Sequence, residues 1–199
     1  MTVRAPDLSH ASAARTEADA VLLAWHQGRM PAGQAAAVLA PLAATAVDHA
    51  NLGAVRRAAG DYPAAEAAYR AALALDPAHV PAYYNLGNLL ADLGRPAEAA
   101  HAYRAALQLQ PGHAQAWNGR GLVLQRSGSL AAAADAYAAA ARHGDGWVEP
   151  VVNRGVALMA LDQPNEALAA LRQARRRAPS HAGAAGNLIA RQVQASLLR

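Results

Sequence analysis

The sequence of 199 residues contains no cysteine, no lysine, no phenylalanine and a single isoleucine, Ile189. The absence of cysteine excludes disulfide bonds and thiol chemistry, and it leaves the redox compartment undetermined. With no phenylalanine and one isoleucine, the chain is poorly suited to a thick core built from large side chains.

Long apolar runs are also missing. The first residues, MTVRAPDLSHASAART, hold no apolar segment of the kind that a secretory signal requires. The other apolar stretches are rich in alanine and far shorter than the roughly 20 residues of a membrane-spanning helix. We therefore expect no membrane partner and a cytoplasmic location.

Charge is scarce. Only 16% of the residues are charged, and the net charge of +4 comes from arginine alone. The arginines are scattered, except in RQARRR at 172–177, which holds four of them. We interpret this run as the end of a helix, where cations meet the negative end of the helix dipole. Contact with an acidic partner or nucleic acid is the alternative, but without interleaved aromatic residues the prediction is no nucleic-acid partner.

What the chain does have is alanine, which accounts for 58 of the 199 residues. Alanine is the strongest helix former, and its small side chain lets two helix backbones approach closely. β-Branched residues are few and no segment alternates between apolar and polar residues. The sequence therefore predicts an all-α fold.

The sequence repeats itself with a period of 34 residues. Four segments that begin at residues 46, 80, 114 and 148 align without a gap. The eighth position is Gly53, Gly87, Gly121 and Gly155; the twentieth is Ala65, Ala99, Ala133 and Ala167; the twenty-fourth is Tyr69, Tyr103, Tyr137 and Leu171; and the thirty-second is Pro77, Pro111, Asp145 and Pro179. Because glycine inside a helix is destabilising by about 0.5–1 kcal/mol relative to alanine, its return indicates a packing requirement.

This pattern resembles the tetratricopeptide repeat, whose unit carries an aromatic residue, Leu-Gly, an alanine, a second aromatic residue and a closing proline. The segment 80–113 matches it best. The resemblance implies a right-handed α-solenoid of helical hairpins, in which no hairpin buries its faces without a neighbour.

The period predicts how the chain is organised. We expect a disordered N-terminal tail at 1–13, a degenerate helix pair at 14–45, four repeats at 46–79, 80–113, 114–147 and 148–181, and a C-terminal capping helix at 182–199. The last helix is rich in alanine and leucine, so it is a candidate for weak homo-oligomer formation through terminal helices.

The resemblance places the first helix of each repeat along a concave groove, into which the sixth position projects. That position is Asn51, Asn85, Gly119, Asn153 and, in the last helix, Asn187. A row of asparagine amides can hold a peptide backbone without reading its side chains. Asn118, beside the glycine that breaks the row, is a partial substitute. The other groove candidates are Arg57, Tyr84, Asn88, Gln115 and Arg126.

Two interpretations of the asparagine row stay open. It is similar to the asparagine ladder of O-GlcNAc transferases and their bacterial relatives, but it also agrees with the consensus of the family whether or not a ligand binds. The leading hypothesis is a non-catalytic scaffold that binds an extended peptide or a partner helix in the groove. The alternative is the substrate-recruiting arm of a bacterial glycosyltransferase of the O-GlcNAc-transferase type.

Chemistry beyond binding is not indicated. No nucleophile has a His–acid pair in register, and no glycine-rich loop could cradle a phosphate, so we expect neither an enzyme nor a cofactor. His79, His113 and His181 recur in register, with Trp147 in the missing place. Successive repeats lie about a helix-packing distance apart, roughly 8–10 Å, so these histidines cannot share one metal ion. A role in the turn is favoured for them.

Overall fold

The computed structural model of the protein describes residues 8–177, and these residues form ten α-helices, one 3-10 turn and no strand. The helices are α1 (Leu8–His26), α2 (Ala32–Leu39), α3 (Ala46–Ala58), α4 (Tyr62–Leu75), α5 (Val80–Asp92), α6 (Pro96–Leu109), α7 (Ala114–Arg126), α8 (Leu130–His143), α9 (Glu149–Ala160) and α10 (Pro164–Arg177), with the 3-10 turn η1 at Ala40–Leu42. The all-α prediction is confirmed for this part of the chain.

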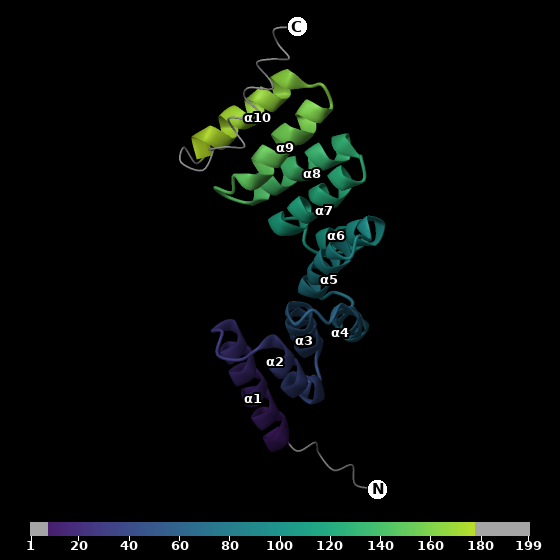
Figure 1. The fold of residues 1–199 in the computed structure, drawn as a ribbon, viewed down its shortest axis with the longest axis vertical. Coiled ribbons are helices and arrows are strands. Elements are labelled where there is room, and N and C mark those ends of the chain that lie inside the picture. Colours follow the sequence, from purple (N-terminus) through teal and green to yellow (C-terminus); the bar gives the residue numbers. More distant parts are fainter. Residues whose placement is uncertain (1–7, 178–199) are drawn as a thin grey trace. The chain divides into compact units, whose positions relative to one another are not determined.

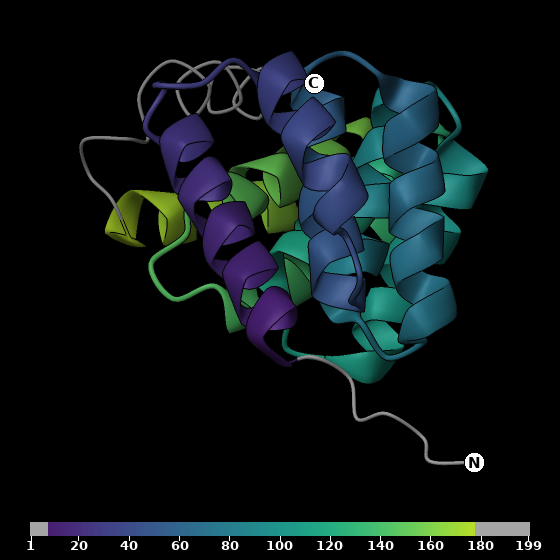
Figure 2. The same ribbon diagram turned by 90° about the horizontal axis from the view of Figure 1, so that it is seen from below.

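The chain forms two compact units, Met1–Leu89 and Leu90–Arg199, which divide within α5. In the first unit α1 packs on α2, α2 on α3, and α3 on α4 (Figures 1 and 2). Leu39, Leu52 and Val55 form part of its buried core. Because short turns join these helices, consecutive helices are antiparallel neighbours.

The second unit repeats this arrangement. α6 packs on α7, α7 on α8, α8 on α9, and α9 on α10, coloured from teal to yellow in Figure 1. Its core contains Tyr137, Val151, Leu158 and Leu171 among many alanines. The alanines keep the helices close together, so a few larger side chains suffice to fill the space between them.

In α3, α7 and α9 the repeated glycine lies against the large residue at the twenty-fourth position. A Cβ atom added at Gly53 would lie 2.6 Å from the Tyr69 ring, and one added at Gly121 would lie 2.5 Å from the Tyr137 ring. Both tyrosines are buried. Burial raises the pKa of Tyr137 to about 12, and its protonated hydroxyl donates to Gln125 Oε1 at 2.8 Å. The glycine therefore provides room for an aromatic ring.

The turn inside each hairpin requires a left-handed backbone at the fifteenth position of the repeat. Gly60, Gly94 and Gly128 have φ of 81°, 71° and 77°, and Asp162 has φ of 57°. Glycine adopts this conformation without the steric penalty that other residues meet. The fourth hairpin therefore forms the same turn with a less suitable residue.

The ends differ from the expectation in one respect. Helix α1 already begins at Leu8, within the segment 1–13 that we expected to be disordered. Residues 8–13 include two alanines and no proline, which suits a helix. The expected capping helix at 182–199, with Asn187, lies outside the described residues.

Candidate functional site

Each of the four helices α3, α5, α7 and α9 presents one stripe toward solvent. The stripe consists of the second, sixth, ninth and thirteenth positions of the repeat, whose spacings of four, three and four residues place them on one side of a helix. We call the set of four stripes the first-helix face. Its members, in chain order, are Val47, Asn51, Ala54 and Ala58; Pro81, Asn85, Asn88 and Asp92; Gln115, Gly119, Leu122 and Arg126; and Glu149, Asn153, Val156 and Ala160.

All of these residues are exposed or half-buried except Gly119. Most of the predicted groove residues therefore lie on this face, namely Asn51, Asn85, Asn88, Gln115, Arg126 and Asn153. The other predicted groove residues described, Arg57, Tyr84 and Asn118, lie next to the stripes, at the fifth and twelfth positions of the repeat.

Asn51 and Asn85 are the open members of the asparagine row. Both are half-buried and both belong to the first unit. Among residues 8–177, neither side chain has a hydrogen-bond partner. An amide carries two N–H donors and an acceptor oxygen, so each of these two residues has its full hydrogen-bonding capacity available to a ligand.

The break in the row at Gly119 has a steric cause. A Cβ atom at this position would lie 2.6 Å from Cζ of Tyr103 and 2.9 Å from its hydroxyl oxygen. Tyr103 is buried, so its ring cannot swing away. An asparagine at position 119 would therefore collide with the ring, and the row is interrupted to make room for it.

Asn118 does not replace the missing member, because it is buried and already paired. Its side chain is 6% exposed, and its Oδ1 accepts a hydrogen bond from Asn153 Nδ2 at 3.5 Å. This bond links α7 to α9. Asn118 and Asn153 of the second unit thus bind each other, whereas Asn51 and Asn85 of the first unit are open.

Four of the remaining predicted residues, Arg57, Tyr84, Asn88 and Arg126, already make interactions within the protein. Arg57 lies close enough to Tyr69 to oppose the effect of burial, which raises the pKa of that hydroxyl to about 12. Tyr84 and Asn88 each have an interaction partner. Arg126 donates from Nη1 to the carbonyl oxygen of Ala91 at 3.3 Å, near the C-terminal end of α5, where a cation is favourable. Gln115 is exposed at the start of α7.

Apolar members of the first-helix face were not predicted. Val47, Leu122 and Val156 are large apolar side chains that stay exposed, with Leu122 and Val156 at the ninth position of neighbouring repeats in the second unit. Asn88 occupies the same position on α5. The sequence signal was available, since the ninth position can be read directly from the ungapped alignment.

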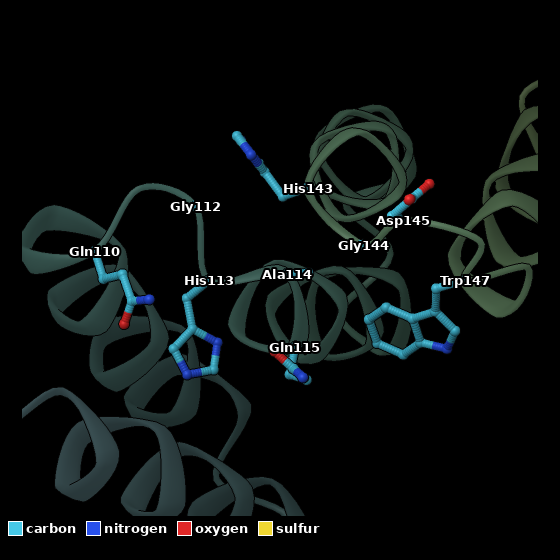
Figure 3. Close-up of a pocket in the computed structure, with 9 residues that line it drawn as sticks. All are labelled: Gln110, Gly112, His113, Ala114, Gln115, His143, Gly144, Asp145 and Trp147. Carbon is cyan, nitrogen blue, oxygen red and sulfur yellow. The ribbon is translucent and has the colours of Figure 1, made fainter.

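A pocket of about 500 Å³ lies between two turns of the second unit, the α6–α7 turn and the α8–α9 turn (Figure 3). The residues that line it are Gln110, Gly112, His113, Ala114, Gln115, His143, Gly144, Asp145 and Trp147. In the view of Figure 3, the Gln115 side chain lies between those of His113 and Trp147. Gln115 also belongs to the first-helix face, so the pocket adjoins that face.

Two of the recurring histidines, His79 and His113, cap helices, and His181 lies outside the described residues. His79 Nδ1 accepts the N–H of Ala82 at 3.1 Å, and His113 Nδ1 accepts the N–H of Ala116 at 3.2 Å. Each bond satisfies one of the N–H groups that the first turn of a helix leaves open, which typically stabilises by about 0.5–2 kcal/mol. The role in the turn that we expected for these histidines is thus a helix cap.

No group of three or more His, Asp or Glu side chains in residues 8–177 is arranged to hold a metal ion. Within the same range, no helix combines the length and the apolar character needed to cross a membrane.

Comparison with known families identifies the class of protein. The model of the family described as tetratricopeptide repeat matches residues 50–111, 84–146 and 152–189. These matches cover more than half of the chain, which therefore belongs to the tetratricopeptide repeat family. No curated protein matches the sequence.

Solved structures show the same fold. The chain is similar to MamA, with a TM-score of 0.73 at 20% identity over 81% of this chain and 95% of MamA. A MamA fragment from Desulfovibrio magneticus RS-1 gives a TM-score of 0.74 at 19% identity, covering 86% of this chain and 96% of the fragment. YrrB, described as a TPR protein with an unusual peptide-binding site, gives 0.68 at 22% identity and 88% coverage of each chain. The predicted fold class, an α-solenoid of tetratricopeptide hairpins, is confirmed.

Proposed function

We propose that this protein is a non-catalytic interaction scaffold that binds an extended peptide segment of a partner protein along its first-helix face. The proposal rests on Asn51 and Asn85, whose side chains have no hydrogen-bond partner among residues 8–177. Equivalent positions of successive repeats place two amides on a solvent-facing surface, and neither amide is used within the residues that the structure describes. Family membership supports the broader role, because tetratricopeptide repeat proteins bind protein or peptide partners.

The two amides suit the main chain of a peptide. An extended peptide offers N–H and C=O groups at regular intervals, and an asparagine side chain can accept from one and donate to the other. A half-buried position also strengthens such bonds, since fewer water molecules compete for them. The partner is therefore held mainly through its backbone at the first unit.

The second unit, taken by itself, offers a different kind of surface. Leu122 and Val156 are exposed there, and Asn118 and Asn153 bind each other. Burying apolar side chains releases about 25 cal/mol per Å² of apolar surface, so these residues favour apolar side chains of the partner. The recruiting-arm hypothesis gains less support than the scaffold, because Asn118 is buried and paired and so does not fill the break in the asparagine row at Gly119.

The test uses peptides selected from a random library displayed on phage, with affinities measured by calorimetry. We expect the double variant N51A/N85A to weaken selected peptides by about tenfold, because two hydrogen bonds of about 0.5–1.5 kcal/mol each are removed. The matched control is N165A, which removes an exposed asparagine from α10, off the first-helix face.

Peptides with single N-methylated backbone amides then separate backbone reading from side-chain reading. When one or two particular backbone amides of the peptide are methylated, the native protein and N51A/N85A should bind the peptide with equal affinity. If N51A/N85A binds the selected peptides as tightly as N165A does, the proposal is wrong.

A further inference from the structure

The turn between α8 and α9 departs from the pattern that the other turns follow. Asp145 stands at the position of Pro77 and Pro111, and Trp147 stands at the position of His79 and His113. Two glycines flank the aspartate, and the second, Gly146, has a φ of 68°. This turn is therefore built differently from the repeat around it.

The helix that follows this turn also lacks a side-chain cap. α9 begins at Glu149, one residue later in its repeat than α3, α5 and α7 do in theirs, and its N-cap residue Val148 has no side chain that could accept a hydrogen bond from the helix. The N–H that His113 accepts comes from the third residue of its repeat, and in the fourth repeat that residue is Pro150, which has no N–H to donate. Sequences that break a local rule in this way often do so at functional positions.

The turn carries an aromatic side chain, Trp147, beside the pocket. The half-buried indole of Trp147 lies against Gly144, where an added Cβ atom would be 3.0 Å from the ring. Only a glycine lets the ring pack this closely to the backbone. The indole forms one wall of the pocket of about 500 Å³, and Gln115 connects that pocket to the first-helix face (Figure 3).

The charge of the pocket selects against acidic ligands. Although the chain contains 18 arginines, none of them lines this pocket. Asp145 supplies the only formal charge among the lining residues when histidines are counted as neutral. Burial lowers the pKa of His113, and its Nδ1 accepts the N–H of Ala116, so both features favour the neutral imidazole. The side-chain oxygens of Gln110 and Gln115 add acceptors.

We propose that this pocket binds an arginine side chain of a partner peptide on the part of the first-helix face that belongs to the second unit. A guanidinium group is planar and stacks on an indole, where the negative face of the ring attracts it. Its N–H groups match the side-chain oxygen of Gln115, which lies beside the indole in Figure 3, and the exposed Asp145 carboxylate adds attraction at longer range. The proposal rests on the proposed function, which it deepens by assigning a preference for one type of side chain.

The experiment probes the pocket directly with the tripeptide acetyl-Gly-Arg-Gly-amide, which is too short to span two repeats. Its citrulline counterpart has nearly the same shape without the charge, and its glutamate counterpart reverses the charge. We expect the arginine tripeptide to cause saturable NMR shifts at the Trp147 indole N–H and at the Gly144 and Gln115 amides. The other two tripeptides should cause none at the same concentration.

Two variants test which residues are responsible. W147H restores the residue that the repeat carries at His79 and His113, so it should fold, and it should weaken the arginine tripeptide by about tenfold. D145N should weaken it about two- to fivefold, while D135N, which removes an exposed aspartate of α8 outside the pocket, should not change it.

Equal shifts from the citrulline tripeptide, or undiminished binding to W147H, would overturn the assignment. The variant N51A/N85A separates this proposal from the proposed function. It should leave the tripeptide affinity unchanged, so loss of library-peptide binding and loss of pocket binding are measured independently.

Discussion

The hairpins α7–α8 and α9–α10 follow the same 34-residue pattern and differ at three of its positions. In the first, Gly121 faces Tyr137, the turn uses Gly128, and His113 caps the leading helix. In the second, Gly155 faces Leu171, the turn uses Asp162, and Trp147 stands at the position of His113. Both hairpins still form, because each unit of a solenoid is stabilised by its neighbours as well as by its own contacts.

The comparison shows which positions the fold requires strictly. An added Cβ at Gly121 would lie 2.5 Å from the Tyr137 ring, whereas one at Gly155 would lie 3.6 Å from Leu171. The glycine at the eighth position is thus sterically necessary only where its partner is a tyrosine. In α9 the same glycine persists without that need.

The largest expected effect comes from adding a methyl group at these two positions. G121A should lower the free energy of unfolding by about 1–3 kcal/mol, because the tyrosine ring and the helix must separate. G155A should raise it by about 0.5–1 kcal/mol, because the space is free and alanine favours the helix. Urea denaturation followed by circular dichroism measures both, and equal effects would show that the two hairpins pack alike.

Exchanging the turn residues should have a smaller effect. G128A forces an alanine into a left-handed backbone and should be destabilising by about 1–2 kcal/mol. D162G should stabilise by less than about 1 kcal/mol, since aspartate tolerates this conformation better than most residues and glycine adds freedom to the unfolded chain. Thermal midpoints of both variants test this, and a lower midpoint for D162G would contradict it.

The caps can be compared in the same way. H113A should be destabilising by about 1 kcal/mol, because the N–H of Ala116 loses its acceptor, whereas H113N should retain most of the stability. Urea midpoints at pH 7.5 measure the difference. A midpoint for H113A equal to that of the native protein would show that the bond to Ala116 contributes nothing.

The smallest expected effect is a pH dependence. Burial lowers the pKa of His113 below its usual value of 6.5, so the folded state binds fewer protons at this residue than the unfolded state. Its contribution to stability is therefore complete above about pH 6.5 and is lost as the pH falls through the folded-state pKa. The urea midpoint of H113N should decline less between pH 7 and pH 5 than that of the native protein, and an identical decline would exclude a role for His113.

The fold was predictable because its determinants recur. The ungapped period and the invariant glycine recur in all four repeats, and the tyrosine and the closing proline each recur in three of them, so these local signals reinforce one another. The start of α1 at Leu8 was missed, because the first residues have no repeat to align with.

The site was less predictable, because its properties depend on contacts between helices. The sequence placed Asn118 and Asn153 in the groove, but it could not show that one buries its amide against the other. Nor could it show that the ring of Tyr103 occupies the space at Gly119. The sequence showed Trp147 as an exception in the histidine series, but it could not show that this residue lines a pocket.

Because Asn118 and Asn153 hydrogen-bond each other, the amides in this part of the surface already have a partner. A ligand that reaches Asn153 must exchange an internal bond for an external one, so little net free energy is released there. The exchange instead favours partners whose shape already suits that region, since a poorly fitting one would open the bond without replacing it. An amide pair of this kind therefore contributes to the selectivity of binding, and it contributes little to the affinity.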